Sequence, residues 1–305
     1  MNQILDGLLK MVSDWTGKFD GAFNIRENGG CAGRRSTEHI KIESKKDQPG
    51  LDIRILPGTK GESVSIPACV THGGVDDLTY NDFYVGENAD VTIVAGCGVH
   101  TETGEPARHN GIHRFFLEKG ARVKYLEKHV GTGKGAGIRR IDPVTEVFMA
   151  EDSVMIMETS QIGGVDSTTR VTRATLAANA KLHIHERLLT EGAQEARTEF
   201  EVVMNGDGAG TDLISRSVAR GDSKQSYRSV ITGNAACTGH SECDAIIGEN
   251  GSVAAAPELV ANHADAALIH EAAIGKIAGE QILKLQTLGL TEKEAEDKIV
   301  EGFLR

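Results

Sequence analysis

The sequence is poor in aromatic residues, proline and cysteine. Of 305 residues, 4% are Phe, Trp or Tyr, 6 are Pro and 5 are Cys, whereas 36 are Gly. A core must therefore be built from Val, Ile, Leu and Ala and joined by many tight turns, which is typical of repetitive β architecture. So few cysteines exclude a secreted disulfide scaffold and favour a reducing, cytoplasmic location.

Other missing features exclude further classes of protein. Basic residues do not cluster beyond pairs and the formal charge is −11, so we expect no binding to nucleic acid. No run approaches the roughly 18 apolar residues of a membrane span. The N-terminus has no basic start and places Asp6 within its apolar stretch, unlike a signal peptide. We therefore expect a soluble protein without membrane contact.

Apolar periodicity predicts an N-terminal region and a β core. Residues 3–16 have helical spacing and residues 40–66 alternate like half-buried strands, which gives a first region over 1–62. From 63 to 266 a small or polar turn followed by an alternating strand recurs, with turns at positions 89, 121, 152 and 180. This nearly regular repeat predicts a β-helix of stacked coils, and a β-sandwich is the alternative.

Residues 267–305 have the periodicity of two amphipathic helices. The first is expected to run to Leu288 and to end at Gly289, and Thr291 with Glu294 forms a capping box that begins the second. The two helices are either a cap on the solenoid or a docking surface for a partner.

Two groups of residues are candidates for thiolate chemistry. Cys97 and His100 lie close together and are followed by His109 and His113, so a thiolate and imidazoles can converge after a turn. Cys237 and Cys243 flank a histidine with the spacing Cys-x2-His-x2-Cys. In an extended strand the two cysteines share a face and the histidine points away, which argues against a closed zinc site. Thiolates in a reducing compartment suit iron–sulfur or redox chemistry, and a small buried hydrophobic residue is the alternative.

Three stretches resemble, in order and spacing, the C-terminal core of the SufB/SufD scaffold family. They are Gln225-Ser226-Tyr227-Arg228, the segment from Gly239 to Ala245, and the segment from Ile269 to Ala295 with its His-Glu-Ala motif. The resemblance is strong over about 225–303 and weaker back to about 68. It implies a right-handed parallel β-helix that is a scaffold for iron–sulfur cluster assembly and not an enzyme.

The resemblance also implies site residues. Cys243 falls on the cysteine of the family's Cys-Asp pair and Glu271 on the glutamate of its His-Glu-Ala motif, both proposed cluster ligands. His270 falls on a histidine that SufD-type members present at the same interface. Cys97 is similar to an upstream cysteine involved in sulfur passage, and it is a further candidate ligand. Such mixed ligation is weaker than four thiolates, so the implied iron–sulfur cluster is transient.

The implied partners follow from the same resemblance. They are a SufC-type ABC ATPase bound by residues 267–305, a sulfur donor, apo-protein recipients, and either a second copy of the chain or a SufD-type partner. The separation between positions 243 and 271 is close to the coil spacing, so we expect stacked coils to place the strand after Cys237 beside the strand that ends at Glu271. Cys243 of each subunit is then expected to face Glu271 and His270 at a dimer interface.

Two other functions compete with the scaffold. A carbohydrate-active β-helix enzyme would use paired carboxylates and require export, and a membrane component of an ABC transporter would require a spanning segment. The sequence has neither an export signal nor a spanning segment, so the scaffold is the preferred prediction.

Overall fold

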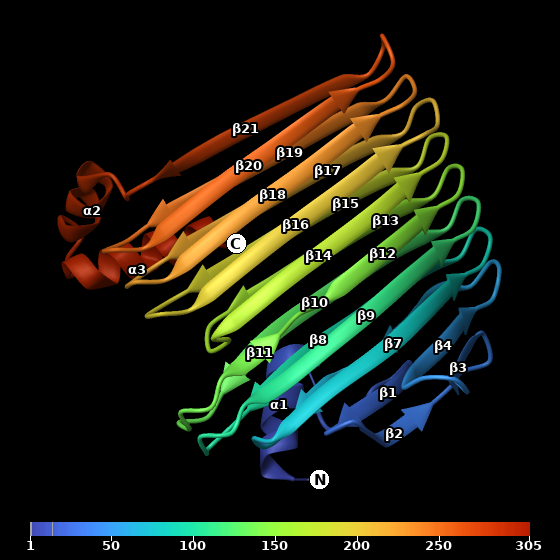
Figure 1. The fold of residues 1–305 in the computed structure, drawn as a ribbon, viewed down its shortest axis with the longest axis horizontal. Helices are drawn as coiled ribbons and strands as arrows, with labels where there is room; N and C mark the ends of the chain where they lie inside the picture. The colour runs from blue at the N-terminus through green and yellow to red at the C-terminus, as the bar shows by residue number, and fades with distance from the viewer. Residues whose placement is uncertain (1, 14) are drawn as a thin grey trace.

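The computed structural model describes residues 2–13 and 15–305 and consists mainly of two parallel β-sheets that face each other (Figure 1). The chain passes from one sheet to the other and back in about eight turns. The predicted parallel β-helix is therefore confirmed, and the β-sandwich is excluded.

Sheet 1 comprises β1 (Ala22–Glu27), β2 (Gly30–Arg35), β5 (Lys60–Ser65), β6 (Ala68–Val70), β8 (Asp90–His100), β10 (Arg122–Thr132), β13 (Val154–Ile162), β15 (Lys181–Thr190), β17 (Gly210–Ala219), β19 (Thr238–Ile247) and β21 (Ala267–Gly275). Sheet 2 comprises β3 (Ile40–Ser44), β4 (Gly50–Ile55), β7 (Val75–Val85), β9 (Ala107–Leu117), β11 (Arg139–Ile141), β12 (Val144–Met149), β14 (Ser167–Leu176), β16 (Glu195–Met204), β18 (Lys224–Gly233) and β20 (Ser252–Ala261). The helices are α1 (Gln3–Ser13), α2 (Gly279–Gln286) and α3 (Glu292–Phe303).

One tight corner recurs from coil to coil and explains the sequence repeat. A residue with left-handed backbone opens each corner: Asn88, Gly120, Asp152, Asn179 and Gly208. A small buried residue follows it: Ala89, Ala121, Ser153, Ala180 and Ala209. Only glycine, asparagine and aspartate adopt this backbone readily, and the small side chain fits inside the bend. The repeat position in the third corner is therefore 153, one residue later than the sequence suggested.

The core lies between the two sheets and is built from in-register columns. Ile93, Tyr125, Met157, Ile184 and Leu213 occupy one column on the inner face of sheet 1 and are fully buried. Burial of each aliphatic side chain contributes roughly 1.5–3 kcal/mol. Because each coil covers the apolar face of its neighbour, coil stacking fixes which side chains meet.

Helix α1 packs against the outer face of β8 at two glycines. A Cβ atom on Gly96 would lie 2.2 Å from the carbonyl oxygen of Val12, and one on Gly98 would lie 3.0 Å from Leu8. The helix predicted over 3–16 is confirmed to Ser13; residue 14 lies outside the described residues, and residues 15 and 16 are not helical. Cys97, between the two glycines, therefore points to the interior behind α1.

The C-terminal region differs from the prediction at its start. Residues 267–275 were expected to be helical but form strand β21, which pairs in parallel with β19, and α2 begins only at Gly279. The capping box of α3 is confirmed, with the Thr291 hydroxyl accepting from the backbone N–H of Glu294 at 3.3 Å. Helix α3 packs on sheet 1 through Val300, whereas α2 buries no side chain. Both helices lie beside the last coils (Figure 1).

None of the helices in the described part of the chain is long and apolar enough to cross a membrane. The division of the chain at residues 62 and 266 stays a prediction.

Candidate functional site

The predicted cluster ligands lie on the last two strands of sheet 1, but not on one face. The two strands are in parallel register with the pairs Cys243/Ala272, Glu242/Glu271 and Ser241/His270. Because side chains alternate along a strand, Cys243 and His270 face the interior and Glu271 faces outward. The coil is one residue longer than the separation between positions 243 and 271, and a shift of one residue reverses the face. The expected pairing of the two strands is therefore confirmed, but within one chain Cys243 and Glu271 lie on opposite faces of the sheet.

Cys243 is buried on the inner face of β19, with an exposed fraction of 4%. Burial, followed by the charges of Glu186 and Asp244, raises the pKa of its thiol to about 12. The sulfur is therefore a protonated thiol at neutral pH, and a metal ion that binds it must displace the proton.

The end of the solenoid next to Cys243 presents free strand edges. Among the described residues no strand pairs with the far side of β20 or β21. The inward side chains there, such as Leu259 and Leu268, are only partly buried, and His270 is exposed. Such an end offers both backbone hydrogen-bonding groups and apolar surface to another molecule.

A row of polar side chains runs through the apolar interior and ends at Cys243. We name it the interior polar row; it consists of Glu127, Thr159, Glu186, Ser215 and Cys243, which share one register column from β10 to β19. All five are buried. Since strands are spaced by about 4.8 Å, the row is roughly 19 Å long.

Arg170, from β14 on the opposite sheet, offsets part of the negative charge of the row. Its guanidinium donates to Glu127 and lies 3.4 Å from Glu186 Oε1. Ser215 donates to the other oxygen of Glu186 at 2.8 Å. Burial by itself raises the pKa of Glu127, but the positive charge of Arg170 outweighs it and holds this pKa well below its usual range. Both glutamates are thus tied to partners, whereas the Thr159 hydroxyl has no hydrogen-bond partner among the described residues.

Cys97 lies near the other end of the row, on the inner face of β8, at the next inward position after Ala95, which occupies the column of the row. It pairs in register with His129, whose Nδ1 is 3.2 Å from Arg170. A small cavity brings it together with His109 and His113, as the sequence predicted. Burial, followed by the charge of Glu127, raises the pKa of the Cys97 thiol well above its usual range. The interior polar row thus connects two buried thiols.

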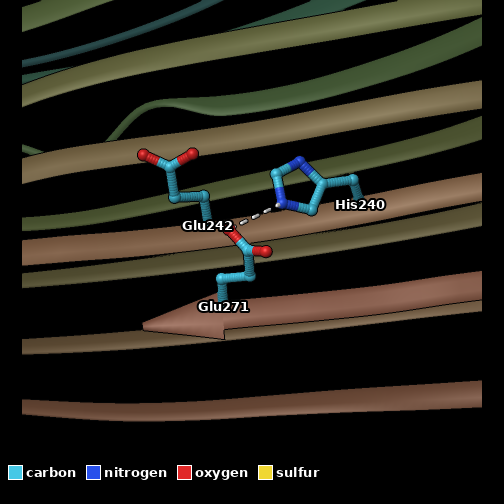
Figure 2. A group of neighbouring side chains, drawn as sticks. All are labelled: His240, Glu242 and Glu271. Carbon is cyan, nitrogen blue, oxygen red and sulfur yellow. Dashed lines mark ion pairs between the residues drawn. The ribbon is translucent and has the colours of Figure 1, made fainter. Parts of the chain in front are cut away.

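A second group of potential ligands lies on the outer face of the same strands. His240 and Glu242 on β19 and Glu271 on β21 place one ligand atom each within 4.8 Å of one another (Figure 2). His240 Nε2 is 3.8 Å from Glu271 Oε2, and its Nδ1 is 2.8 Å from Asp212 Oδ1. Burial, followed by the charge of Asp244, raises the pKa of Glu242. We name His240, Glu242 and Glu271 the outer-face triad.

Sequence reasoning missed the interior polar row, although a signal for it exists. Its members stand at inward positions of otherwise apolar strands, one in each successive coil. A polar residue that returns once per coil at a core position is the signal. Sequence reasoning placed His240 on the face opposite Cys243 correctly, but it did not join His240 to Glu242 and Glu271.

The fold and the site define a β-solenoid protein that keeps buried thiols and potential metal ligands within a few coils of each other. Residues 79–303 match the family described as SUF system FeS cluster assembly, SufBD core domain. The chain therefore belongs to the SufBD family, which is involved in iron–sulfur cluster assembly. Family membership removes the support for a carbohydrate-active enzyme or a transporter component.

Curated relatives from archaea cover most of the chain. An iron–sulfur cluster assembly SufBD family protein of Methanothermobacter thermautotrophicus is 29% identical over 86% of this chain and 64% of that protein. A SufBD family protein of Archaeoglobus fulgidus is 28% identical over 88% of this chain and 71% of the relative. One of Methanocaldococcus jannaschii is 26% identical over 88% of this chain and 85% of the relative. The chain thus spans less than two thirds of the Methanothermobacter protein.

Proposed function

We propose that this chain is a cytoplasmic scaffold on which iron–sulfur clusters are assembled together with a SufC-type ABC ATPase. The observation that supports it most is the interior polar row, which leads from the region of Cys97 to Cys243 through an apolar solenoid. Buried polar groups are costly unless they serve a purpose, and here they follow one line over successive coils. All five cysteines are free thiols, which suits a reducing compartment.

In this proposal Cys97 receives sulfur and Cys243 holds it for the cluster. Thiol–persulfide exchange passes the outer sulfur from one thiolate to another without net oxidation or reduction. The two cysteines lie on strands that are five spacings apart, so at least roughly 24 Å separates them, which is too far for direct exchange. A hydrosulfide ion therefore takes the outer sulfur from Cys97 as HSS⁻, which restores the Cys97 thiol, and gives it up to Cys243, which regenerates the hydrosulfide, so that no oxidant or reductant is consumed. The hydroxyl, carboxylate and guanidinium groups of the row provide a polar environment for HSS⁻ between the two cysteines.

The cluster is proposed to form at the free end of the solenoid, where two copies of the chain meet. Each copy contributes the thiolate of Cys243 with His270 from the inner face and Glu271 from the edge strand. Because β21 is an edge strand, its displacement opens a path around it from the outer to the inner face. Ligation by few thiolates is weak enough to release the cluster to recipient proteins.

The ATPase is proposed to bind α2 and α3. Strand β21 ends at Gly275 and α2 begins at Gly279, so three residues separate the strand that covers Cys243 from the helix. A movement of α2 driven by ATP binding is therefore transmitted to β21 over a short distance.

The test compares two routes of sulfur supply in Thr159→Val. The hydroxyl of Thr159 has no hydrogen-bond partner among the described residues, so its isosteric replacement leaves stability unchanged or higher. We expect the initial rate of anaerobic cluster assembly to fall several-fold when a persulfide donor supplies sulfur, and to stay unchanged with inorganic sulfide.

Thr211→Val is the matched control. Thr211 also lies on the inner face of sheet 1, outside the row, and its buried hydroxyl has no hydrogen-bond partner in the described part of the chain. Equal donor-driven rates in both variants and the wild type would contradict a role of the row in sulfur passage.

A further inference from the structure

We propose that the outer-face triad binds one divalent first-row metal ion. One imidazole and two carboxylates form a donor set that suits Fe²⁺, Mn²⁺, Co²⁺ or Zn²⁺, and it contains no thiolate. The site does not include Cys243, which faces the other side of the sheet, and it shares only Glu271 with the proposed cluster site. That the ion is ferrous iron in the cell rests on the proposed function; the site itself does not.

The imidazole of His240 is prepared for metal binding by Asp212. A carboxylate only accepts hydrogen bonds, so the 2.8 Å contact means that Nδ1 of His240 carries the proton and donates it to Asp212. Nε2 then carries an unprotonated lone pair and is directed at Glu271 (Figure 2). A carboxylate that orients a ligating histidine is a common support of metal sites in proteins.

The distances leave room for an ion between the ligands. The 3.8 Å between His240 Nε2 and Glu271 Oε2 is too long for a hydrogen bond. Two ligand atoms that share an ion at about 2.1 Å lie roughly 3 Å apart, so small side-chain movements close the site. The side chains of His240, Glu242 and Glu271 are 33%, 20% and 68% exposed, which gives an ion access from solvent.

Strand register adds a reason for a cation at this place. Glu242 and Glu271 are directly paired on adjacent strands, and like charges in such pairs repel. Within the described part of the chain, two basic side chains lie within 4.0 Å of these carboxylates: Arg216, 4.0 Å from Glu242, and His240, 3.8 Å from Glu271. A divalent ion between the two carboxylates removes the repulsion.

The position of the triad gives the site a role in the proposed function. Glu242 and Cys243 are consecutive residues, so an ion on the triad lies directly across the sheet from the thiol. Only β21 separates it from the free edge of the sheet. We infer that the triad holds iron on the outer face of sheet 1 until the edge strand β21 moves.

The experiment measures binding of Co²⁺ to the full chain by anaerobic calorimetry and absorption, without sulfide. We expect one ion per chain without a thiolate-to-cobalt charge-transfer band. His240→Ala and Glu242→Gln should each lower the affinity about tenfold or more, and Asp212→Asn about tenfold. His263→Ala and Glu258→Gln, near the same end of the solenoid but outside the triad, are the matched controls and should bind like the wild type.

Three results would overturn the site: equal affinity in all variants, a charge-transfer band, or loss of the ion in Cys243→Ser. The iron role is measured separately as the rate of cluster assembly at limiting Fe²⁺. We expect His240→Ala to be slower at limiting iron and normal at excess iron; no difference would refute the role in iron supply while the cobalt result stands. If the wild type binds Co²⁺ but assembles no cluster, the proposed function fails and the site remains.

Discussion

Arg170 is the side chain on which the charge balance inside the solenoid depends. It is 4% exposed and lies between two buried carboxylates, Glu127 and Glu186. A buried ion pair adds little net stability, because desolvation offsets the attraction, but the loss of one partner leaves an uncompensated buried charge. The polar interior therefore tolerates the removal of a hydroxyl far better than the removal of this guanidinium.

We predict that Arg170→Met lowers the free energy of unfolding by about 3–5 kcal/mol, because Glu127 and Glu186 lose their cation. Chemical denaturation at neutral pH measures the change. Arg173→Met is the matched control, since Arg173 lies on the outer face of the same strand in an exposed pair with Glu201, and its loss should cost no more than about 1 kcal/mol. Similar losses in both variants would contradict a structural role for the interior pair.

Cys243→Ser should lose cluster binding while the fold is retained, because a hydroxyl is a much poorer iron ligand than a thiolate. Anaerobic reconstitution followed by absorption and Mössbauer spectroscopy measures it. Cys31→Ser, at an exposed thiol, should be silent. Cys69→Ser should also reconstitute a cluster, at some cost in stability, because it buries a hydroxyl among apolar side chains. A full cluster on Cys243→Ser would refute the ligand assignment.

His113 should make the protein less stable in mild acid. Burial lowers the pKa of His113 to about 4, whereas the unfolded chain takes up the proton near pH 6.5. The unfolded state therefore binds more protons between these values, so stability is complete above pH 6.5 and falls as the pH approaches 4, by at most roughly 3 kcal/mol. Denaturation of His113→Gln should depend less on pH over this window. An identical pH dependence in both proteins would show that the histidine is not responsible.

The site shows how finely residue-level prediction depends on coil length. Composition and spacing predicted the stacked coils, and the resemblance picked out Cys243, His270 and Glu271. The actual coil between β19 and β21 is one residue longer than the spacing suggested, and that residue decides that Glu271 joins His240 instead of Cys243. Corner lengths vary from coil to coil, so the face of a given side chain follows only from the register.

At the scale of elements, the sequence predicted the solenoid, α1 and α3 but mistook β21 for a helix. Ile274, Ile277 and Ala278 lie at spacings of three and four that fit a helix, and the alternation of Leu268, His270, Ala272 and Ile274 fits a strand equally well. Pairing with β19 decides between them, because it satisfies the backbone groups of β21 on one side.

Helix α2 is the element best suited to contact a partner. Leu283 in the helix and Leu288 just after it are 61% and 75% exposed, and the helix buries no side chain. We predict that Leu283→Glu combined with Leu288→Glu abolishes co-purification with the ATPase, while β-sheet circular dichroism is unchanged. Met11→Glu, at an exposed apolar residue of α1, is the control and should retain the complex. Survival of the complex in the α2 variant would place the contact elsewhere.

At the scale of the whole molecule, the free end of the solenoid should join two copies. Sedimentation at micromolar concentration should give a dimer of the wild type. Ala272→Lys places a charge on the inner face of β21 and should shift the protein toward the monomer. Ala273→Lys, the next residue on the outer face, should remain dimeric. A wild-type monomer, or an equal effect of both substitutions, would contradict pairing through this end.

Coil stacking also fixes distances along the solenoid in steps of one strand spacing. Cys97 and Cys243 lie on strands that are five spacings apart, so the insertion of one coil between them lengthens the proposed path by about 4.8 Å and leaves both end geometries unchanged. Deletion of a coil shortens it by the same step. The distance between the two thiols therefore changes only in steps of one coil. Insertion or deletion of a coil alters the length of the proposed sulfur path without any change in the residues around Cys97 or Cys243.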